Sequence, residues 1–108
     1  MKLLLDTSRT TFTVTREVEP KVDRDTGAQR MDRTTKALLW VVQVMALDAT
    51  GGEMLTITVA GDAPKVNVGQ AVNPVELEAI PWAQGGRNGV AFRATSINVA
   101  SGKSASAA

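Results

Sequence analysis

Hydrophobic and polar positions alternate with a period of two along most of the chain, which predicts an all-β domain. In the first such segment the β-branched run places Phe12, Val14 and Val18 on one side. The most apolar segment is too short to span a membrane and too rich in Val to favour a helix. Five strands are predicted, over residues 10–18, 37–47, 54–59, 74–80 and 89–99.

The segments between these strands carry turn and loop residues. Residues 19–36 are dominated by charged side chains after Pro20 and predict a long solvated loop or flexible hairpin, and we identify no internal repeat. Residues 65–72 are short and punctuated by Gly, which favours a loop over a turn of helix. Residues 101–108 contain Ser, Ala, Gly and one Lys and predict a flexible tail after a single domain over residues 1–100.

This order of strands and loops is typical of a five-stranded Greek-key barrel of the OB type, with a long loop between its first two strands. In that fold, ligands lie across strands two and three, between the loop that joins strands one and two and the loop that joins strands four and five. Here those loops are residues 19–36 and 82–89.

Charge is distributed unevenly although the net charge is only +1. Residues 1–36 carry eight cations and six acids, residues 37–79 one cation and five acids, and residues 80–108 three cations and no acid. The two loops at the expected ligand site are therefore the basic regions of the chain, and a polyanion is the ligand that such a distribution favours.

The chain contains no Cys and no His, which removes thiolate and imidazole chemistry. Glu76 and Glu78 would share one face of a strand, where paired glutamates are usually solubilising. We therefore expect a protein that is not an enzyme and holds no metal or cofactor. The N-terminal residues lack the apolar core of a signal peptide, so we expect a cytoplasmic protein without a membrane partner.

The pairing register decides which side chains face outward, because a slip of one residue exchanges the faces. If Asp48 pairs with Glu53, then Val42 and Val44 point inward and Trp40 joins the core. The outer face then carries Gln43, Met45, Thr56 and Thr58. This face lacks the aromatic side chains that single-strand binders usually present.

The remaining candidates are basic or aromatic. Trp82 either stacks on an unpaired base or caps one mouth of the barrel, and Arg87, beside a predicted Asn88-Gly89 turn, either contacts phosphate or serves solubility. Arg93 is expected to point outward while Phe92 packs in the core. Three cations of the first loop either track a phosphate backbone or form a solvated face: Arg30, Arg33 and Lys36.

Six short motifs are spread along the chain: Asp6-Thr7-Ser8, Glu19-Pro20-Lys21-Val22-Asp23, Trp40-Val41-Val42-Gln43-Val44, Thr58-Val59-Ala60-Gly61, Pro81-Trp82-Ala83-Gln84 and Gly89-Val90-Ala91-Phe92-Arg93-Ala94. In these motifs the chain resembles a group of small actinobacterial proteins encoded beside the replication and excision genes of integrative conjugative elements and plasmids, described as regulatory or replication-activator proteins. The likeness covers roughly residues 3–100 and includes no catalytic signature.

The resemblance implies a role in starting or regulating replication, integration or excision of such an element. Together with the charge pattern, it predicts an accessory protein that binds single-stranded or locally opened DNA weakly. The alternative is an adaptor that contacts a replication initiator, helicase or integrase without binding DNA. The sequence leaves the oligomeric state open, a dimer included.

Overall fold

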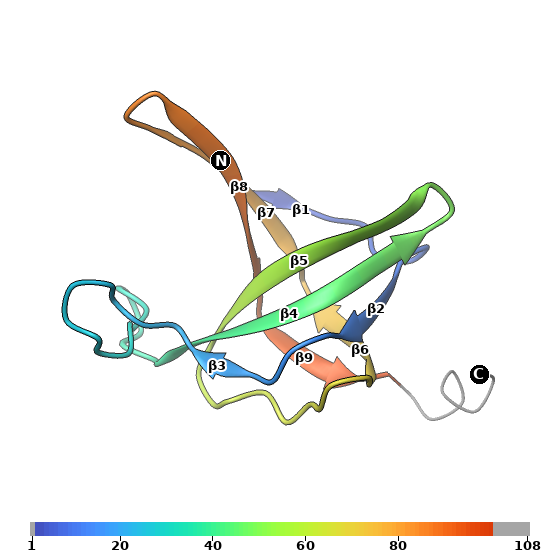
Figure 1. Ribbon diagram of the computed structural model, residues 1–108, viewed down its shortest axis with the longest axis horizontal. Helices are drawn as coiled ribbons and strands as arrows, with labels where there is room; N and C mark the ends of the chain where they lie inside the picture. The colour runs from blue at the N-terminus through green and yellow to red at the C-terminus, as the bar shows by residue number, and fades with distance from the viewer. Residues whose placement is uncertain (1, 101–108) are drawn as a thin grey trace.

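The protein forms one curled, all-β sheet (Figure 1). The computed structural model describes residues 2–100, which contain no helix. The predicted tail at residues 101–108 lies outside the described residues. The strands are β1 (Leu3–Leu4), β2 (Thr11–Val14), β3 (Glu19–Pro20), β4 (Leu39–Asp48), β5 (Gly51–Ala60), β6 (Ala71–Val75), β7 (Glu78–Gln84), β8 (Arg87–Ala94) and β9 (Ser96–Val99).

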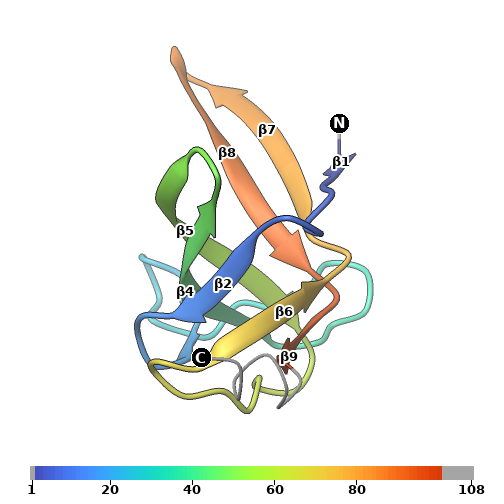
Figure 2. The ribbon, with the colours of Figure 1, turned by 90° about the vertical axis from the view of Figure 1, so that its right-hand side faces the viewer.

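The sheet curls because the last two long segments of the chain, β6–β7 and β8–β9, are each bent in the middle. The strand order is β1-β7-β8-β5-β4-β2-β6-β9, with β3 paired to β4. At the bend, Glu76 has a left-handed backbone (φ 52°), and Thr95 donates from its hydroxyl to Glu76 Oε1 at 2.8 Å. Below the bend β6 and β9 pair and β6 also pairs with β2, whereas above it β7 and β8 pair and β8 runs parallel to β5 (Figure 2). The predicted fourth and fifth strands are therefore each divided in two, and Glu76 does not share a regular strand with Glu78.

The central β4–β5 hairpin has Asp48 opposite Gly51, joined by a two-residue turn. The predicted partner, Glu53, was wrong by two residues because the Asp48 carboxylate accepts the backbone N–H and hydroxyl of Thr50, at 2.8 and 2.6 Å, and tightens the turn. A shift of two residues leaves the faces unchanged. The predicted inward positions of Val42 and Val44 are confirmed, because both side chains are fully buried.

The core is built from alternate positions of the long strands. Its most completely buried members include Val42 and Val44 on β4 and Ile57 on β5, all with 0% exposure. The connection at residues 61–70 is a loop, as predicted, and its Val66 packs into the core. Other members are Phe12, Val14, Val59, Val72, Leu77, Ala94 and Ile97.

One aromatic side chain differs from the prediction. Trp40 is only half-buried and lies outside the core cluster, because its indole N–H donates to the backbone oxygen of Gly61 at 2.8 Å. Phe92 packs against the core, as predicted, although it is half-buried. The core is therefore almost entirely aliphatic.

The segment between β3 and β4 is folded into two successive hairpins, residues 21–30 and 30–39, which we call the double hairpin. At its base three backbone hydrogen bonds form a closed triangle. Lys21 N–H donates to Leu39 O (3.0 Å), Leu39 N–H to Arg30 O (2.9 Å), and Arg30 N–H to Lys21 O (2.7 Å). Each hairpin also has one bridge pair, Val22 with Gln29 in the first and Met31 with Leu38 in the second.

The two hairpins are copies of one nine-residue unit, so the prediction that the chain has no internal repeat was wrong. Asp23 and Asp32 begin equivalent turns, in which aspartate Oδ1 accepts the N–H groups two and three residues on, at 2.8 to 3.2 Å. Four residues on, Gly27 (φ 74°) and Lys36 (φ 64°) have left-handed backbones. Only four of the nine aligned residues are identical (Asp, Arg, Thr and Ala), which is why the repeat is inconspicuous in the sequence.

Candidate nucleic-acid interface

Five predicted site residues lie on one face of the sheet, which we call the outer face. Gln43 on β4 is opposite Thr56 on β5, and Met45 is two pairs further along the ladder. Thr58 on β5 is level with Arg93 on the parallel strand β8. None of these side chains is fully buried, whereas most of the positions that alternate with them are: Val42, Val44, Ile57, Val59 and Ala94.

The outer face continues along the β7–β8 hairpin. Arg93 is opposite Glu78, Gly89 is opposite Trp82 and Arg87 is opposite Gln84, so alternation places Trp82 and Arg87 on the same face as Arg93. The hairpin tip is formed by two Gly residues at 85 and 86, with φ of 60° and 79°. The predicted Asn88-Gly89 turn was wrong because the Gly pair supplies both positive φ values that a two-residue hairpin turn requires.

Trp82 lies on this projecting hairpin and is 43% exposed. Its ring covers Gly89, because a Cβ added at Gly89 would lie 2.8 Å from Trp82 Cζ2. Trp82 therefore lies away from the core of the curled sheet. One face of the indole rests on the sheet, and the ring retains exposed area that is available for stacking.

The double hairpin reaches the outer face through an ion pair between Arg93 and Asp32. The guanidinium donates to Asp32 Oδ2, while Oδ1 accepts the N–H groups of Thr34 and Thr35. The guanidinium, followed by these two N–H groups, holds the pKa of the Asp32 carboxyl well below its usual range. The Asp32 side chain is 11% exposed and the Arg93 side chain 37%, so Arg93 keeps donors that face solvent.

Lys21 is a further cation at this point that the sequence analysis did not single out. Its Nζ donates to Thr58 Oγ1 at 3.3 Å, which brings the first residue of the double hairpin onto the outer face. Burial, and then the charge of Arg30, lower the pKa of Lys21. The nine-residue spacing between Lys21 and Arg30 is the signal that could have identified it.

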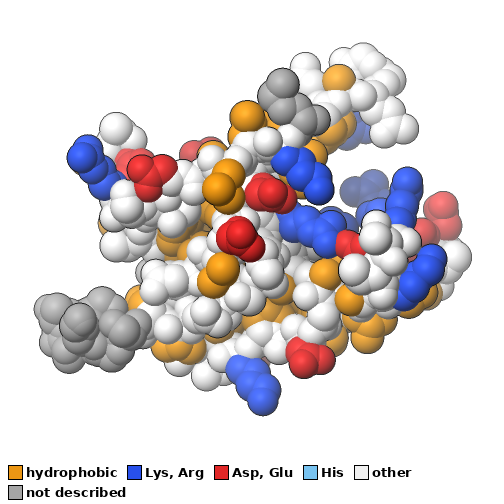
Figure 3. All heavy atoms as spheres, turned by 180° about the vertical axis from the view of Figure 1, so that it is seen from behind, with side chains coloured by type: hydrophobic (Ala, Val, Ile, Leu, Met, Phe, Trp, Pro, Cys, Tyr) orange, Lys and Arg blue, Asp and Glu red, His pale blue; other side chains and the backbone are white. Residues whose placement is uncertain are grey.

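The three predicted cations of the first loop are exposed on the second hairpin. Arg30 and Arg33 line, with Arg93, an open groove of about 310 Å³ that also includes Met31 and Leu39. Lys36 lies beside them in a neighbouring groove. Viewed from behind, Lys and Arg side chains gather on the side of the molecule where the double hairpin lies (Figure 3).

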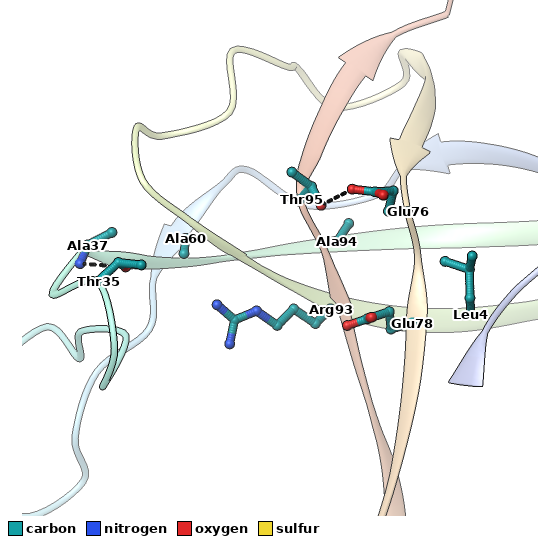
Figure 4. A pocket seen from close by; sticks show the side chains of 9 residues that line it. All are labelled: Leu4, Thr35, Ala37, Ala60, Glu76, Glu78, Arg93, Ala94 and Thr95. Atoms are coloured by element: carbon teal, nitrogen blue, oxygen red, sulfur yellow. Dashed lines mark hydrogen bonds between the residues drawn. The ribbon is translucent and has the colours of Figure 1, made fainter. Parts of the chain in front are cut away.

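An open groove of about 560 Å³ borders these cations on the side of the bend. Its walls come from the second hairpin at Thr35 and from β7 and β8, and Arg93 extends across it toward Thr35 (Figure 4). Glu76 and Glu78 line the other side. Their carboxylates would repel a polyanion, so this groove limits the cationic surface.

The opposite end of the outer face is apolar. Met45 is opposite Met54, and Leu47 follows on β4. Met54 is 46% exposed and Leu47 52%. This row contains no charge and no aromatic ring.

Residues 2–100 contain no group of three Asp, Glu, His or Cys side chains placed to hold a metal ion. Over the same residues, no helix is long and apolar enough to cross a membrane. Comparison with protein-family models, with curated proteins and with solved structures found no match to the chain.

Proposed function

We propose that the sheet is an OB-like barrel of five strands, in which β6–β7 and β8–β9 each count as one bent strand. The pairing of β2 with β6 and the parallel pairing of β5 with β8 support this assignment, since together they return the sheet to its first strand. The double hairpin is then the loop between strands one and two, and the β7–β8 tip is the loop between strands four and five. These loops flank the ligand surface in OB folds.

The proposed function is that of a non-enzymatic accessory protein which binds single-stranded or locally opened DNA weakly. The observation that carries it is the packing of the basic double hairpin on the outer face, where Asp32 meets Arg93 on β8 and Lys21 meets Thr58 on β5. The role in replication, integration or excision of a mobile element rests on the resemblance described above.

Phosphate contacts are assigned to the exposed arginines, because a guanidinium matches the geometry of a phosphate. Trp82 supplies one stacking surface, worth about 1–3 kcal/mol for one base. Gln43, Thr56 and Thr58 supply hydrogen-bonding groups between the two loops. With a single exposed Trp on the outer face, the affinity is expected to be low. A single strand is favoured over a duplex because residues 2–100 offer no helix for a major groove.

Titration with an oligodeoxythymidylate and with a duplex of equal length, followed by tryptophan fluorescence at several salt concentrations, tests this function. For three or four phosphate contacts, the slope of log affinity against log salt is expected to be about −2 to −3 with the single strand. Tighter binding of the duplex, or affinity independent of salt, would contradict the proposal.

The apolar row formed by Met45, Leu47 and Met54 favours a second candidate, an adaptor that contacts a replication initiator, helicase or integrase. Exposed apolar side chains that lie together are typical of protein interfaces. Absence of oligonucleotide binding at low salt would favour this candidate. Substitution of Met54 and Leu47 by Ser would then abolish the partner contact.

A further inference from the structure

Within residues 2–100, Arg93 is the only arginine of the outer face that forms an ion pair with an aspartate. It lies where the double hairpin meets the outer face, level with Thr58, and it lines the same groove as Arg30 and Arg33. A phosphate contact at this position would therefore compete with the carboxylate of Asp32.

The repeat shows that the ion pair is not needed to build the turn. In the first hairpin Asp23 makes the same two Oδ1 hydrogen bonds, to the N–H groups of Asp25 and Thr26, and no ion pair of Asp23 occurs in the described part of the chain. In the second hairpin Asp32 Oδ1 makes these bonds, and Oδ2 is left for Arg93. The turn thus uses one carboxylate oxygen, and the other is free to exchange its partner.

We propose that Arg30, Arg33 and Arg93 form a phosphate subsite in which the Asp32 carboxylate takes the place of the phosphate, and that a polynucleotide phosphate displaces Asp32 Oδ2 from Arg93. Carboxylate and phosphate oxygens accept hydrogen bonds from a guanidinium in the same geometry. Because Arg93 is partly exposed, a phosphate can reach its guanidinium from solvent and compete with Asp32 for it. This inference rests on the proposed function, since it names one contact of the same site.

The repeat provides a matched pair of variants. In both Asp32→Asn and Asp23→Asn, the side-chain amide oxygen can still accept the N–H groups of its turn, and each variant removes one negative charge from the double hairpin. We expect Asp32→Asn to bind fluorescein-labelled oligodeoxythymidylate about fivefold more tightly than the wild type at low salt, the effect of freeing one unit charge beside a phosphate. The salt slope should steepen by about 0.7. Asp23→Asn frees no arginine, because no ion pair of Asp23 occurs in the described part of the chain, and it should change the affinity by less than about twofold.

Equal tightening by both variants would overturn the proposal, since the effect would then be that of net charge. Weaker binding by Asp32→Asn would overturn it too, because Asp32 would then position Arg93 for the ligand. If the wild type and both variants fail to bind any oligonucleotide at low salt, the proposed function fails, and the subsite fails with it. Binding by the wild type without tightening in Asp32→Asn would reject the subsite alone.

A measurement on the wild-type protein avoids any folding defect of the variants. On titration with unlabelled oligodeoxythymidylate, the ¹³C signal of the Asp32 side-chain carboxyl is expected to shift as Oδ2 leaves Arg93, whereas that of Asp23 stays in place. An unchanged Asp32 signal at saturation would overturn the subsite.

Discussion

The indole ring of Trp82 lies directly over the α-carbon of Gly89 on the neighbouring strand. A methyl group at Gly89 would lie 2.8 Å from Cζ2 and 3.1 Å from Nε1 of that ring. The absence of a side chain at Gly89 therefore lets the ring lie flat on the β7–β8 hairpin. The orientation of the one exposed tryptophan of the outer face is fixed by a backbone position on the opposite strand.

Gly89→Ala is expected to lift the indole from the hairpin and to lower the free energy of unfolding by only about 1 kcal/mol, because the exposed ring can move away. Measured in a Trp40→Phe background, the tryptophan emission should change and oligonucleotide affinity should fall. Val90→Ala, on the other face of the same strand, serves as the control and should leave both unchanged. An unchanged emission would show that the ring does not rest on Gly89.

Trp82→Ala and Arg87→Ala are expected to reduce oligonucleotide binding while lowering the unfolding free energy by less than about 1 kcal/mol, because both side chains are exposed. By contrast, Ile57→Ala removes a fully buried side chain and should cost about 2–5 kcal/mol. Urea unfolding and fluorescence anisotropy separate the two classes. If Trp82→Ala lowered stability as much as Ile57→Ala, our placement of Trp82 outside the core would be wrong.

Lys36 has a left-handed backbone at the position where the first hairpin has Gly27. Lys36→Gly is expected to stabilise the protein by about 0.5–1 kcal/mol, because left-handed φ is unfavourable for residues with a Cβ. It should also weaken oligonucleotide binding through the loss of a cation.

The reverse substitution, Gly27→Lys, is the control for Lys36→Gly. A Cβ at Gly27 meets nothing within 4 Å, so no clash is expected. The unfolding free energy should fall by about 1–2 kcal/mol because a residue with a Cβ must then adopt a left-handed backbone. Both changes are measured by thermal unfolding. Similar stability of the two variants would contradict the equivalence of the two turns.

The pH dependence of stability should report the Asp32–Arg93 pair. Because folding lowers the pKa of Asp32, the pair stabilises the folded state above the unfolded aspartate pKa, which is about 3.9, and this contribution is lost as the pH falls below it. The urea midpoint of the wild type should therefore fall more steeply between pH 5 and pH 2 than that of Asp32→Asn. Identical slopes would mean that the pair does not persist in solution.

Alternation alone predicted the two faces of the β4–β5 hairpin, since Thr56 and Thr58 alternate with apolar residues along β5. The exact register could not be predicted in this way. It is set by the hydrogen bonds of Asp48 with Thr50, which depend on side-chain geometry that composition does not reveal. The Gly pair at 85 and 86 and the Asn88-Gly89 dipeptide were both plausible turns. Only the packing of Trp82 on Gly89 distinguishes them, and that contact forms across the hairpin.

The candidate site was predictable where it lies on regular strands. Gln43 and Arg93 follow from alternation, whereas Asp32 and Lys21 reach the outer face only because the double hairpin folds back over it. That placement depends on contacts between residues far apart in the sequence, such as Asp32 with Arg93. No local pattern in the charged run specifies these contacts.

The triangle of backbone hydrogen bonds among Lys21, Arg30 and Leu39 makes the double hairpin modular. The first unit begins at Lys21 and ends where Arg30 begins the second, and the second ends at Leu39, the first residue of β4. Each unit therefore closes on a residue of the triangle, and one unit can be removed without changing how the chain enters β4. Deletion of residues 22–30 would remove one unit and leave Lys21 next to Met31, with a single hairpin closing on Leu39. We expect a loop of this design to tolerate the loss of nine residues, with the charges that they carry, without a change in the curled sheet on which it is mounted.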